Sequence, residues 1–571
     1  MPRGDARVPS GVSRQETATD VELPRARRTV SALASTGGTW LRALAAGART
    51  ARVDIAIIVT VTGLAAALRL WHLGTVPLGI HGDEAWTGLD ARRVLHEGWI
   101  GPYVDSALGQ PTGPLYVTAL LFSFLPDTTT TVRASMALLG VATVPLAYAA
   151  FGSMFNRTAG AFAALLLAVM MWHLHLSRTA FMVVSWPFVE MAVLWALWQA
   201  MRRGSWWLFA VAGALHGMGI YAYNVYLLFL PVPFVTLAWA WWSATGAVEK
   251  RRVLAGAASF AVAAMIVAVP MVRYVIDHGD EYREHQRVVA LTDSQRWKDA
   301  GAGGRVELIR DRAEEWGRGL AQGDRPDYGD GLATAGHPVV APAVLLLALG
   351  GLAMAAWNWR RAENVTLLAA CALLPGGALL TVGDGLFRRT LGLAPFVAVL
   401  AALPLAWVWQ RLSAAPRPAC YVCRGALLAA VAAIGAQATY QYFGPVQDAQ
   451  EMRIVYPYQL DAASRYMEHL PEGTYVYFFS SRWSFDYETR RFLAPDVSGE
   501  DRSREFGQAP VAAGGALDFS ARPSGDVAFV FLAPYLDDVA RAITRYPGGE
   551  PSQQQRGNEV MFRAYLVRRP S

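Results

Sequence analysis

Two pairs of charged residues, about 300 positions apart in the chain, are the strongest candidates for chemistry. The first pair, Asp83 and Glu84, stands in the string GIHGDEAWTG, shortly after the end of a long apolar run. A carboxylate at the boundary between membrane and water is partly desolvated, which favours proton acceptance near neutral pH. Asp83 could also cap a helix over 84–97 that stops at Gly98, and capping is compatible with catalysis.

The second pair, Arg388 and Arg389, lies in the string GDGLFRRT, just before another apolar run. The planar fork of a guanidinium binds phosphate well. An anionic group nearby would offset the cost of placing arginines at the mouth of a membrane span. Snorkelling towards lipid head groups is the alternative explanation.

Two further segments carry polar side chains between apolar runs. The string HLHLSRTAF contains an HxH pair that ends at His175, followed by Arg178. This pair could bind a metal, but the sequence shows no third ligand. The string GIYAYNVY contains Tyr221, Tyr223 and Asn224, which fit either an interfacial aromatic belt or the stacking of a sugar ring.

The composition predicts a polytopic α-helical membrane protein. Hydrophobic residues make up 54% of the 571 positions and charged residues 17%, against about 25% charged in a soluble domain. The net charge of +6 resides mostly in short loops between apolar runs, so membrane topology explains it and nucleic-acid binding is not indicated. The predicted spans, about eleven, are 54–71, 131–151, 159–175, 183–201, 206–221, 223–243, 253–276, 338–357, 364–382, 388–409 and 424–441.

The loop charges predict the orientation of these spans. With the Arg-rich N-terminus in the cytoplasm, the loops after the even-numbered spans are basic and fall inside, as the positive-inside rule requires. Residues 113–125 are apolar but too few to span, and counting them would reverse every later loop. We therefore expect a juxtamembrane or re-entrant helix there. The outer face then receives the loops 72–130 and 277–337.

Three regions follow from this interpretation. Residues 1–50 are predicted to be a disordered, basic, cytoplasmic N-terminus, and residues 51–444 a transmembrane module. Residues 445–571 are predicted to be a small extracytoplasmic α/β domain. Its expected helices are 450–470 and 535–546, and its expected strands are 474–480, 526–532 and 559–567.

The DE pair, the later QPTGPLY, the HLSRTA segment and the late RRTLGLAPF occur in an order that resembles the family 39 membrane glycosyltransferases of the C-type fold. That family includes the dolichyl-phosphate-mannose protein mannosyltransferases and the lipid A aminoarabinose transferases. The resemblance covers about 54–410 and implies that Asp83 is the catalytic carboxylate. It also implies that Arg388 or Arg389 contacts the lipid phosphate. Two features depart from the family pattern: Gln110 replaces the Lys of a KPPLY-like string, and 182–186 lack the acid found there in many members.

We therefore expect an inverting glycosyltransferase, hexosyl or pentosyl, that moves a sugar from a polyprenyl-phosphate donor to an acceptor hydroxyl at the outer face. Asp83 would be the general base, supported by Glu84, which could orient it or hold a cation. The residues expected to bind the donor phosphate are Arg388, Arg389 and Arg178. The residues expected to bind substrate are His81, Gln110, Tyr116, His175, Tyr221, Tyr223 and Asn224.

Other functions remain open from the sequence. One is a lipid-linked oligosaccharide ligase or another envelope polymer transferase of the same architecture; another is a transporter or flippase of lipid-linked sugars. A transporter should carry charges near the bilayer midplane, whereas this sequence puts them in outer loops. We expect no resident metal site, although a divalent cation is possible. The partners would be the lipid bilayer, a polyprenyl-phosphate-linked sugar and a protein, lipid or polysaccharide acceptor, at the plasma or inner membrane.

Overall fold

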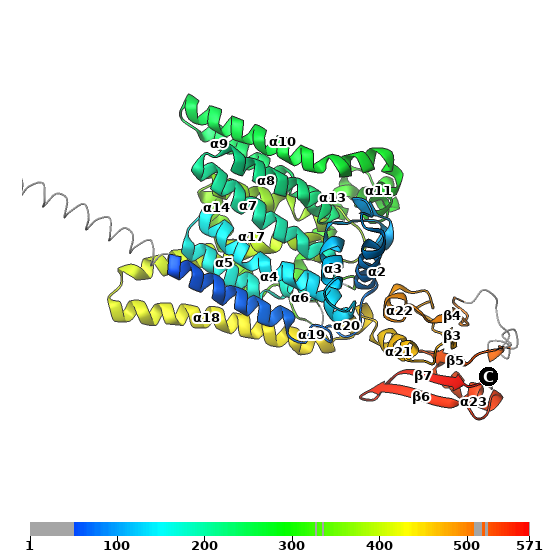
Figure 1. The fold of residues 1–571 in the computed structure, drawn as a ribbon. Helices are drawn as coiled ribbons and strands as arrows, with labels where there is room; N and C mark the ends of the chain where they lie inside the picture. Colours follow the sequence, from blue (N-terminus) through cyan, green and yellow to red (C-terminus); the bar gives the residue numbers. More distant parts are fainter. Residues whose placement is uncertain (1–50, 326–327, 334–335, 507–516, 520–523, 570–571) are drawn as a thin grey trace, which may run out of the picture. The chain divides into compact units, whose positions relative to one another are not determined.

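The computed structural model describes residues 51–325, 328–333, 336–506, 517–519 and 524–569. The predicted cytoplasmic segment 1–50 lies outside the described residues. From Ala51 onward the chain is mostly helical up to a small sheet near its C-terminal end (Figure 1).

Among the described residues, eight helices are long and apolar enough to cross a membrane, or nine if one bent pair counts as a span. The chain is therefore a multi-pass membrane protein, as predicted. All eleven predicted segments are at least partly helical, but α8 (Trp206–Met218) and α14 (Pro342–Trp357) are short, so the count of eleven is not confirmed. The long spans run through Ala51–Leu70, α4 (Thr129–Met154), α7 (Ser185–Arg203), α9 (Pro231–Ser243), α10 (Ala247–Asp277), α15 (Ala362–Leu373), α17 (Ala394–Arg411) and α18 (Arg417–Phe443).

Local sequence sets where these helices begin and bend. The side chain of Thr128 accepts a hydrogen bond from the backbone of Thr131 and so caps α4. Asn156 caps α5 (Arg157–Val169) in the same way. Met170 then adopts an extended backbone, and α6 (Met171–Arg178) leaves at 56° to α5. The bend ends the predicted third span early and turns α6 towards the outer loops.

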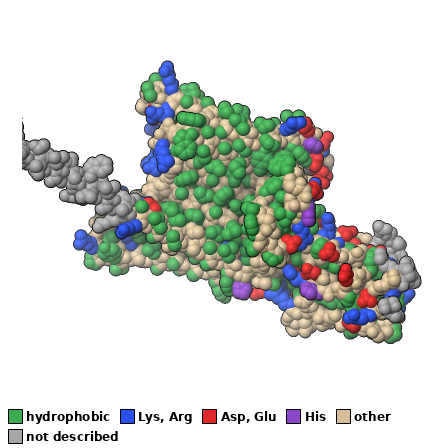
Figure 2. All heavy atoms as spheres, in the orientation of Figure 1, with side chains coloured by type: hydrophobic (Ala, Val, Ile, Leu, Met, Phe, Trp, Pro, Cys, Tyr) green, Lys and Arg blue, Asp and Glu red, His purple; other side chains and the backbone are tan. Residues whose placement is uncertain are grey.

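The helices pack in neighbouring pairs, α8 with α10, α14 with α17, and α4 with both α5 and α7 (Figure 1). Figure 2 shows hydrophobic side chains over the face of these helices, with Lys and Arg at the end where α9 meets α10 and acidic side chains at the opposite end, over α11. The basic end carries loops that are predicted to be cytoplasmic, because basic residues favour that side of a membrane.

The two predicted outer loops fold into short elements. The first contains α2 (Gly82–Glu97), the two-stranded pair β1 (Tyr103–Val104) and β2 (Gln110–Pro111), and α3 (Gly113–Phe122). The expected short helix at 113–125 is thus present as α3, which packs on α2 and α4. The second loop contains α11 (Gly279–Val289), α12 (Gln295–Asp299) and α13 (Ala302–Ala321).

The C-terminal region is a five-stranded mixed sheet of order β4-β3-β5-β7-β6. Hydrophobic clusters lie on both faces of the sheet, which explains why its central strands have continuous apolar sequences. The elements are α19 (Pro445–Asp448), α20 (Gln450–Val455), α21 (Tyr458–Glu468), β3 (Tyr475–Phe479), α22 (Glu488–Leu493), β4 (Ser498–Asp501), β5 (Val527–Phe531), α23 (Val539–Arg545), β6 (Glu550–Arg556) and β7 (Glu559–Val567).

Three of these strands, β3, β5 and β7, match the predicted ones. The predicted helix 450–470 is broken at Pro457, because proline cannot donate the next helical hydrogen bond. β4, β6 and α22 were not predicted: β4 and β6 are edge strands with polar sequences, and α22 is only six residues long.

Candidate active site

The start of α2 orients the first charged pair. The ring of His81 accepts a hydrogen bond from the backbone N–H of Asp83 (3.0 Å), and the carboxylate of Glu84 accepts one from the backbone N–H of His81 (2.9 Å). This reciprocal arrangement is a capping box. Burial lowers the pKa of His81, consistent with a neutral ring whose nitrogen can accept. The cap is therefore His81, and the alternative that Asp83 caps this helix is wrong.

The side chain of Asp83 contacts Arg388, which lies 305 residues later in the chain. The distance between Asp83 Oδ2 and Arg388 Nη1 is 2.6 Å. Asp330 holds the other side of this arginine, accepting from its backbone N–H (2.6 Å) and lying 3.3 Å from its Nε. Asp330 is completely buried, so Arg388 is held from behind while its tip reaches Asp83.

The turn before Arg388 determines how its side chain projects. Gly385 has φ +87°, a conformation that other residues rarely adopt. The buried indole of Trp172 then donates a hydrogen bond to the carbonyl of Phe387 (2.8 Å), which fixes the backbone next to Arg388. The side chain of Arg389 instead donates to Thr381 and to the carbonyl of Val382.

Asp83, Arg388 and Arg389 line one cavity of about 840 Å³. The cavity lies between α2, the β1–β2 loop, the segment ahead of α17 and α22. Eight of its lining residues are charged, with both signs present, and the apolar ones include Leu89, Ala107, Leu108 and Val289. The charged and other polar or aromatic residues that line it are His81, Asp83, Trp86, Asp90, Arg93, Asp105, Ser106, Arg388, Arg389, Tyr487, Glu488 and Arg491.

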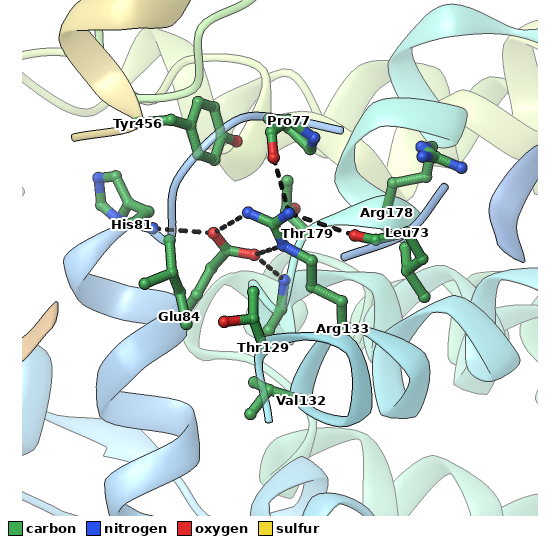
Figure 3. A network of polar contacts seen from close by, with 12 residues as sticks. Leu73, Pro77, His81, Glu84, Thr129, Val132, Arg133, Arg178, Thr179 and Tyr456 are labelled. Carbon is green, nitrogen blue, oxygen red and sulfur yellow. Dashed lines mark hydrogen bonds and ion pairs between the residues drawn. The ribbon is translucent and has the colours of Figure 1, made fainter. Parts of the chain in front are cut away.

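Glu84 does not reach this cavity, which corrects the expectation that it acts beside Asp83. Its carboxylate and the guanidinium of Arg133 are both fully buried and 2.8 Å apart (Figure 3). The same carboxylate accepts from the backbone N–H groups of His81 and Ala180. Burial alone would raise the pKa of Glu84, but the charge and hydrogen bonds of Arg133 lower it below its usual value. Glu84 is thus an ionised structural anchor.

Arg178 and His175 are likewise buried away from the cavity, contrary to the expectation that they bind substrate. Arg178 donates to the carbonyls of Leu68, Arg69 and Val76, which leaves it no role in binding a phosphate at this site. His175 lies 2.7 Å from the carbonyl of Asp330, and so supports the loop that holds Arg388. Arg178 thus connects α6 to the end of the first span, and His175 connects α6 to the second outer loop.

The aromatic residues expected to bind sugar are divided between two places. Tyr116 and Tyr221 line a separate, largely apolar cavity of about 420 Å³ between α3, α7 and α10. Tyr221 donates its hydroxyl to the carbonyl of Val267 (2.8 Å). Tyr223 stacks on Trp186 and lies within the electrostatic reach of the arginine pair and of Asp83.

Gln110 and Asn224 support the loop beside the charged cavity. The amide of Gln110 donates to Ser106 (3.1 Å) and to Asp90 (3.4 Å), both of which line the cavity. Ser106 also donates to Asp90, and burial raises the pKa of that carboxyl. Asn224 donates to the carbonyl of Gly109. Gln110 and Asn224 position the loop, and neither is among the residues that line the charged cavity.

Sequence reasoning missed two parts of the site. Asp330 lies in a glycine-rich string, DYGDGLATAG. The one sequence signal for it is an acidic residue within an irregular segment of the second outer loop. The second part is Tyr487, Glu488 and Arg491, which lie at the start of or within α22, a helix that the sequence did not predict. Among the described residues, no three His, Cys, Asp or Glu side chains gather as a metal site, and Asp83 and Glu84 point in different directions.

A family model and solved structures match this chain. Residues 109–274 match the model described as dolichyl-phosphate-mannose-protein mannosyltransferase. ArnT of Cupriavidus metallidurans, solved with undecaprenyl phosphate, shares 14% identity at a TM-score of 0.51, covering 90% of this chain and 97% of that one. Its apo structure shares 12% identity at 0.50, covering 91% and 98%. No curated protein matches the chain by sequence.

The oligosaccharyltransferase of Archaeoglobus fulgidus, solved with a tethered acceptor peptide, shares 15% identity at a TM-score of 0.50. The match covers 78% of this chain, which spans only 63% of the archaeal protein. At such identities the likeness shows the fold alone. The chain has the C-type glycosyltransferase fold with a small C-terminal sheet, and the resemblance to the family 39 membrane glycosyltransferases is confirmed.

Proposed function

We propose that this membrane protein, with its C-type glycosyltransferase fold, is an inverting glycosyltransferase that takes its sugar from a polyprenyl-phosphate donor. The observation that carries the proposal is the 2.6 Å contact between Asp83 and Arg388, on a cavity that Arg389 also lines. A general base and two phosphate-binding groups are the parts that such a transfer needs. The fold match to ArnT, which was solved with undecaprenyl phosphate, supports this donor class.

Arg388 and Arg389 bind the donor phosphate through charge-assisted hydrogen bonds. Asp330 stays on the Nε side of Arg388, which leaves the tip of the guanidinium to the phosphate. The phosphate thereby displaces the carboxylate of Asp83 from Arg388. A carboxylate released from a guanidinium is a stronger base, so donor binding prepares Asp83 for its role.

The transfer is then a single displacement. Asp83 takes the proton from the acceptor hydroxyl as its oxygen attacks the anomeric carbon from the face opposite the phosphate. The bond between that carbon and the phosphate oxygen breaks, and its electron pair leaves with the phosphate. Arg388 and Arg389 stabilise the charge that grows there. The leaving group is already an anion and needs no general acid, so one carboxylate suffices and 182–186 can lack an acid.

The apolar cavity beside α3, α7 and α10 suits the hydrocarbon tail of the donor, because its lining is almost wholly nonpolar. The site faces the extracytoplasmic side on the predicted orientation, with the basic loops in the cytoplasm.

The deciding experiment compares Asp83→Asn with wild type in lipid nanodiscs. A panel of radiolabelled undecaprenyl-phosphate hexoses and pentoses serves as donor, and both transfer to acceptor and slow hydrolysis by water are measured. We expect Asp83→Asn to lower both rates by about 10²–10⁴-fold, the usual contribution of a general base. The variant should bind undecaprenyl phosphate at least as tightly as wild type, because Arg388 loses a competing anion.

Asp496→Asn is the matched control, since Asp496 is exposed on the C-terminal domain and does not line the cavity. Unchanged transfer by a folded Asp83→Asn protein would refute the mechanism. Movement of intact donor across the bilayer, without any transfer, would instead indicate the transporter.

A further inference from the structure

Helix α22 of the C-terminal domain is fastened to α2, the helix that carries Asp83. Phe492 of α22 lies so close to Gly88 that a Cβ there would come within 2.4 Å of its ring. Thr489 donates a buried hydrogen bond to the carbonyl of Ile80 (3.0 Å). Arg92 of α2 covers the ring of Phe492 at 4.5 Å. These contacts hold α22 beside α2. We call Tyr487 and the α22 side chains that face the charged cavity the α22 wall.

The side chains at this wall enter the charged cavity. Tyr487, Glu488 and Arg491 all line it. Glu488 accepts a hydrogen bond from the indole N–H of Trp86 (2.9 Å), and the guanidinium of Arg491 lies 5.2 Å from the centre of the same ring system. Trp86 thus connects the α22 side chains to α2, one turn after Asp83.

These groups lie next to the proposed catalytic aspartate. A Cβ added at Gly82 would lie 3.0 Å from the hydroxyl of Tyr487 and 3.4 Å from Oε2 of Glu488. Burial, with the negative charges of Glu488 and Asp83, raises the pKa of Tyr487 to about 12, so its hydroxyl keeps its proton and can donate. Arg388 and Arg389 belong to a different wall, ahead of α17.

The chemistry of this wall suits a hydroxyl-rich ligand. It offers a carboxylate acceptor, a guanidinium donor and a phenol, with the aromatic rings of Trp86 and Tyr487 beside them. Aromatic faces with charged hydrogen-bonding groups suit a sugar ring, which presents C–H surfaces and hydroxyls together.

Building on the glycosyltransferase function proposed above, we propose that α22 forms the acceptor wall of the cavity. Tyr487, Glu488 and Arg491 bind a carbohydrate whose hydroxyl is presented to Asp83. The acceptor is thus a sugar residue of a glycan, and the C-terminal domain supplies the groups that select it.

Two measurements on the full-length protein in nanodiscs test this. The first is binding of methyl glycosides of mannose, glucose, galactose and arabinose by saturation-transfer NMR, with a Ser/Thr-containing peptide as the competing probe. The second is hydrolysis of the undecaprenyl-phosphate sugar by water without acceptor. We expect Glu488→Gln and Arg491→Ala to weaken glycoside binding by about 10–100-fold, the range for losing one hydrogen bond to a charged group. Donor hydrolysis, which needs no acceptor, should fall by a smaller factor than glycoside binding.

Glu472→Gln, an exposed position on the same domain, is the matched control and should leave both readouts unchanged. Asp83→Asn should keep glycoside binding while losing hydrolysis and transfer. If glycosides bind through α22 but wild type hydrolyses and transfers no undecaprenyl-phosphate sugar, the proposed function fails and the carbohydrate wall stands. The inference is overturned if wild type binds no glycoside, if it binds only the peptide, if both α22 variants bind as wild type, or if they lower donor hydrolysis by as large a factor as glycoside binding.

Discussion

Asp83 and Glu84 are adjacent carboxylates, and each has an arginine partner, yet the two ion pairs lie in opposite environments. The Glu84–Arg133 pair is completely buried, whereas 38% of the Asp83 side chain and 18% of the Arg388 side chain are exposed. Neighbours on a helix point about 100° apart, so one residue faces the protein interior and the other the cavity. Charge at a membrane boundary thus indicates function only where the charge also meets a cavity.

The buried pair fastens three parts of the chain together. Arg133 of α4 donates to the carbonyls of Leu73, Pro77 and Gly79 as well as to Glu84 (Figure 3). These carbonyls belong to the connection from the first span to α2. In the Asp83–Arg388 pair, Arg388 Nη1 donates to Asp83 Oδ2 at the surface of the cavity, and this is the kind of contact that a ligand can replace.

The largest effect that separates the two pairs should come from Arg133→Ala. It leaves a buried carboxylate without its counter-charge, which typically costs about 3–5 kcal/mol of stability. The change in the free energy of unfolding can be measured by thermal or denaturant unfolding of the purified protein in detergent. Failure to accumulate folded protein would agree with this, and Arg133→Lys, which keeps the charge, should fold but be less stable than wild type.

Glu97→Ala is the control for this measurement. Glu97 pairs with Arg93 on the same helix, α2, but both side chains are about half exposed. Such a pair is worth about 0.3–0.5 kcal/mol, so the variant should unfold within that margin of wild type. An Arg133→Ala protein no less stable than the Glu97→Ala protein would contradict the structural role of the buried pair.

A smaller effect, on binding instead of folding, is expected from Arg388→Ala. Losing one charge-assisted contact to a phosphate should lower the affinity for undecaprenyl phosphate by about 10–100-fold, equivalent to about 1.5–3 kcal/mol of binding free energy. Arg388→Lys should recover only part of this loss, because a lysine lacks the planar fork. Binding can be followed by microscale thermophoresis or native mass spectrometry in nanodiscs.

Arg360→Ala, at an exposed position in the loop before α15, is the matched control and should bind like wild type. If wild type and Arg388→Ala bound undecaprenyl phosphate with equal affinity, the proposal that Arg388 binds the donor phosphate would be wrong. Loss of stability as large as that of Arg133→Ala would show that the two pairs do not differ in kind.

The sequence predicts much of this molecule because its strongest signals are local. Apolar runs predict the helices, and the alternation of loop charge agrees with their arrangement. The pair Asp83 and Arg388 was suggested by residue type and by family resemblance, and the fold brings the two side chains into contact.

The sequence does not predict which way a charged side chain points, nor which distant residues it contacts. Nothing in the string GDEAW says that Glu84 points inward, since that depends on Arg133, 49 residues later. As an arginine, Arg178 could bind a phosphate, but its guanidinium already donates hydrogen bonds to the carbonyls of Leu68 and Val76. The α22 wall could be recognised only once the fold of the C-terminal domain was known, because Glu488 contacts Trp86, which is 402 residues away in the chain.

The smallest expected effect is the pH dependence of the buried pair, isolated by comparing wild type with a variant that lacks the Glu84 carboxyl. Despite the burial, which opposes ionisation, Arg133 lowers the pKa of Glu84 in the folded protein below its ordinary value of about 4.5, so the unfolded chain binds the proton more readily. The ion pair therefore contributes its full stability above about pH 4.5 and loses it as the pH falls through the lower, folded-state pKa. Glu84→Gln has no such proton to bind, and the gap in unfolding free energy between it and wild type should narrow in that acid range.

Unfolding midpoints at a series of pH values between neutral and about pH 3 measure this gap, with the exposed Glu472→Gln variant expected to track wild type throughout. A constant gap over the whole series would mean that Glu84 does not enter the fold as a carboxylate, and the distinction between the two neighbouring acids would then rest on burial alone.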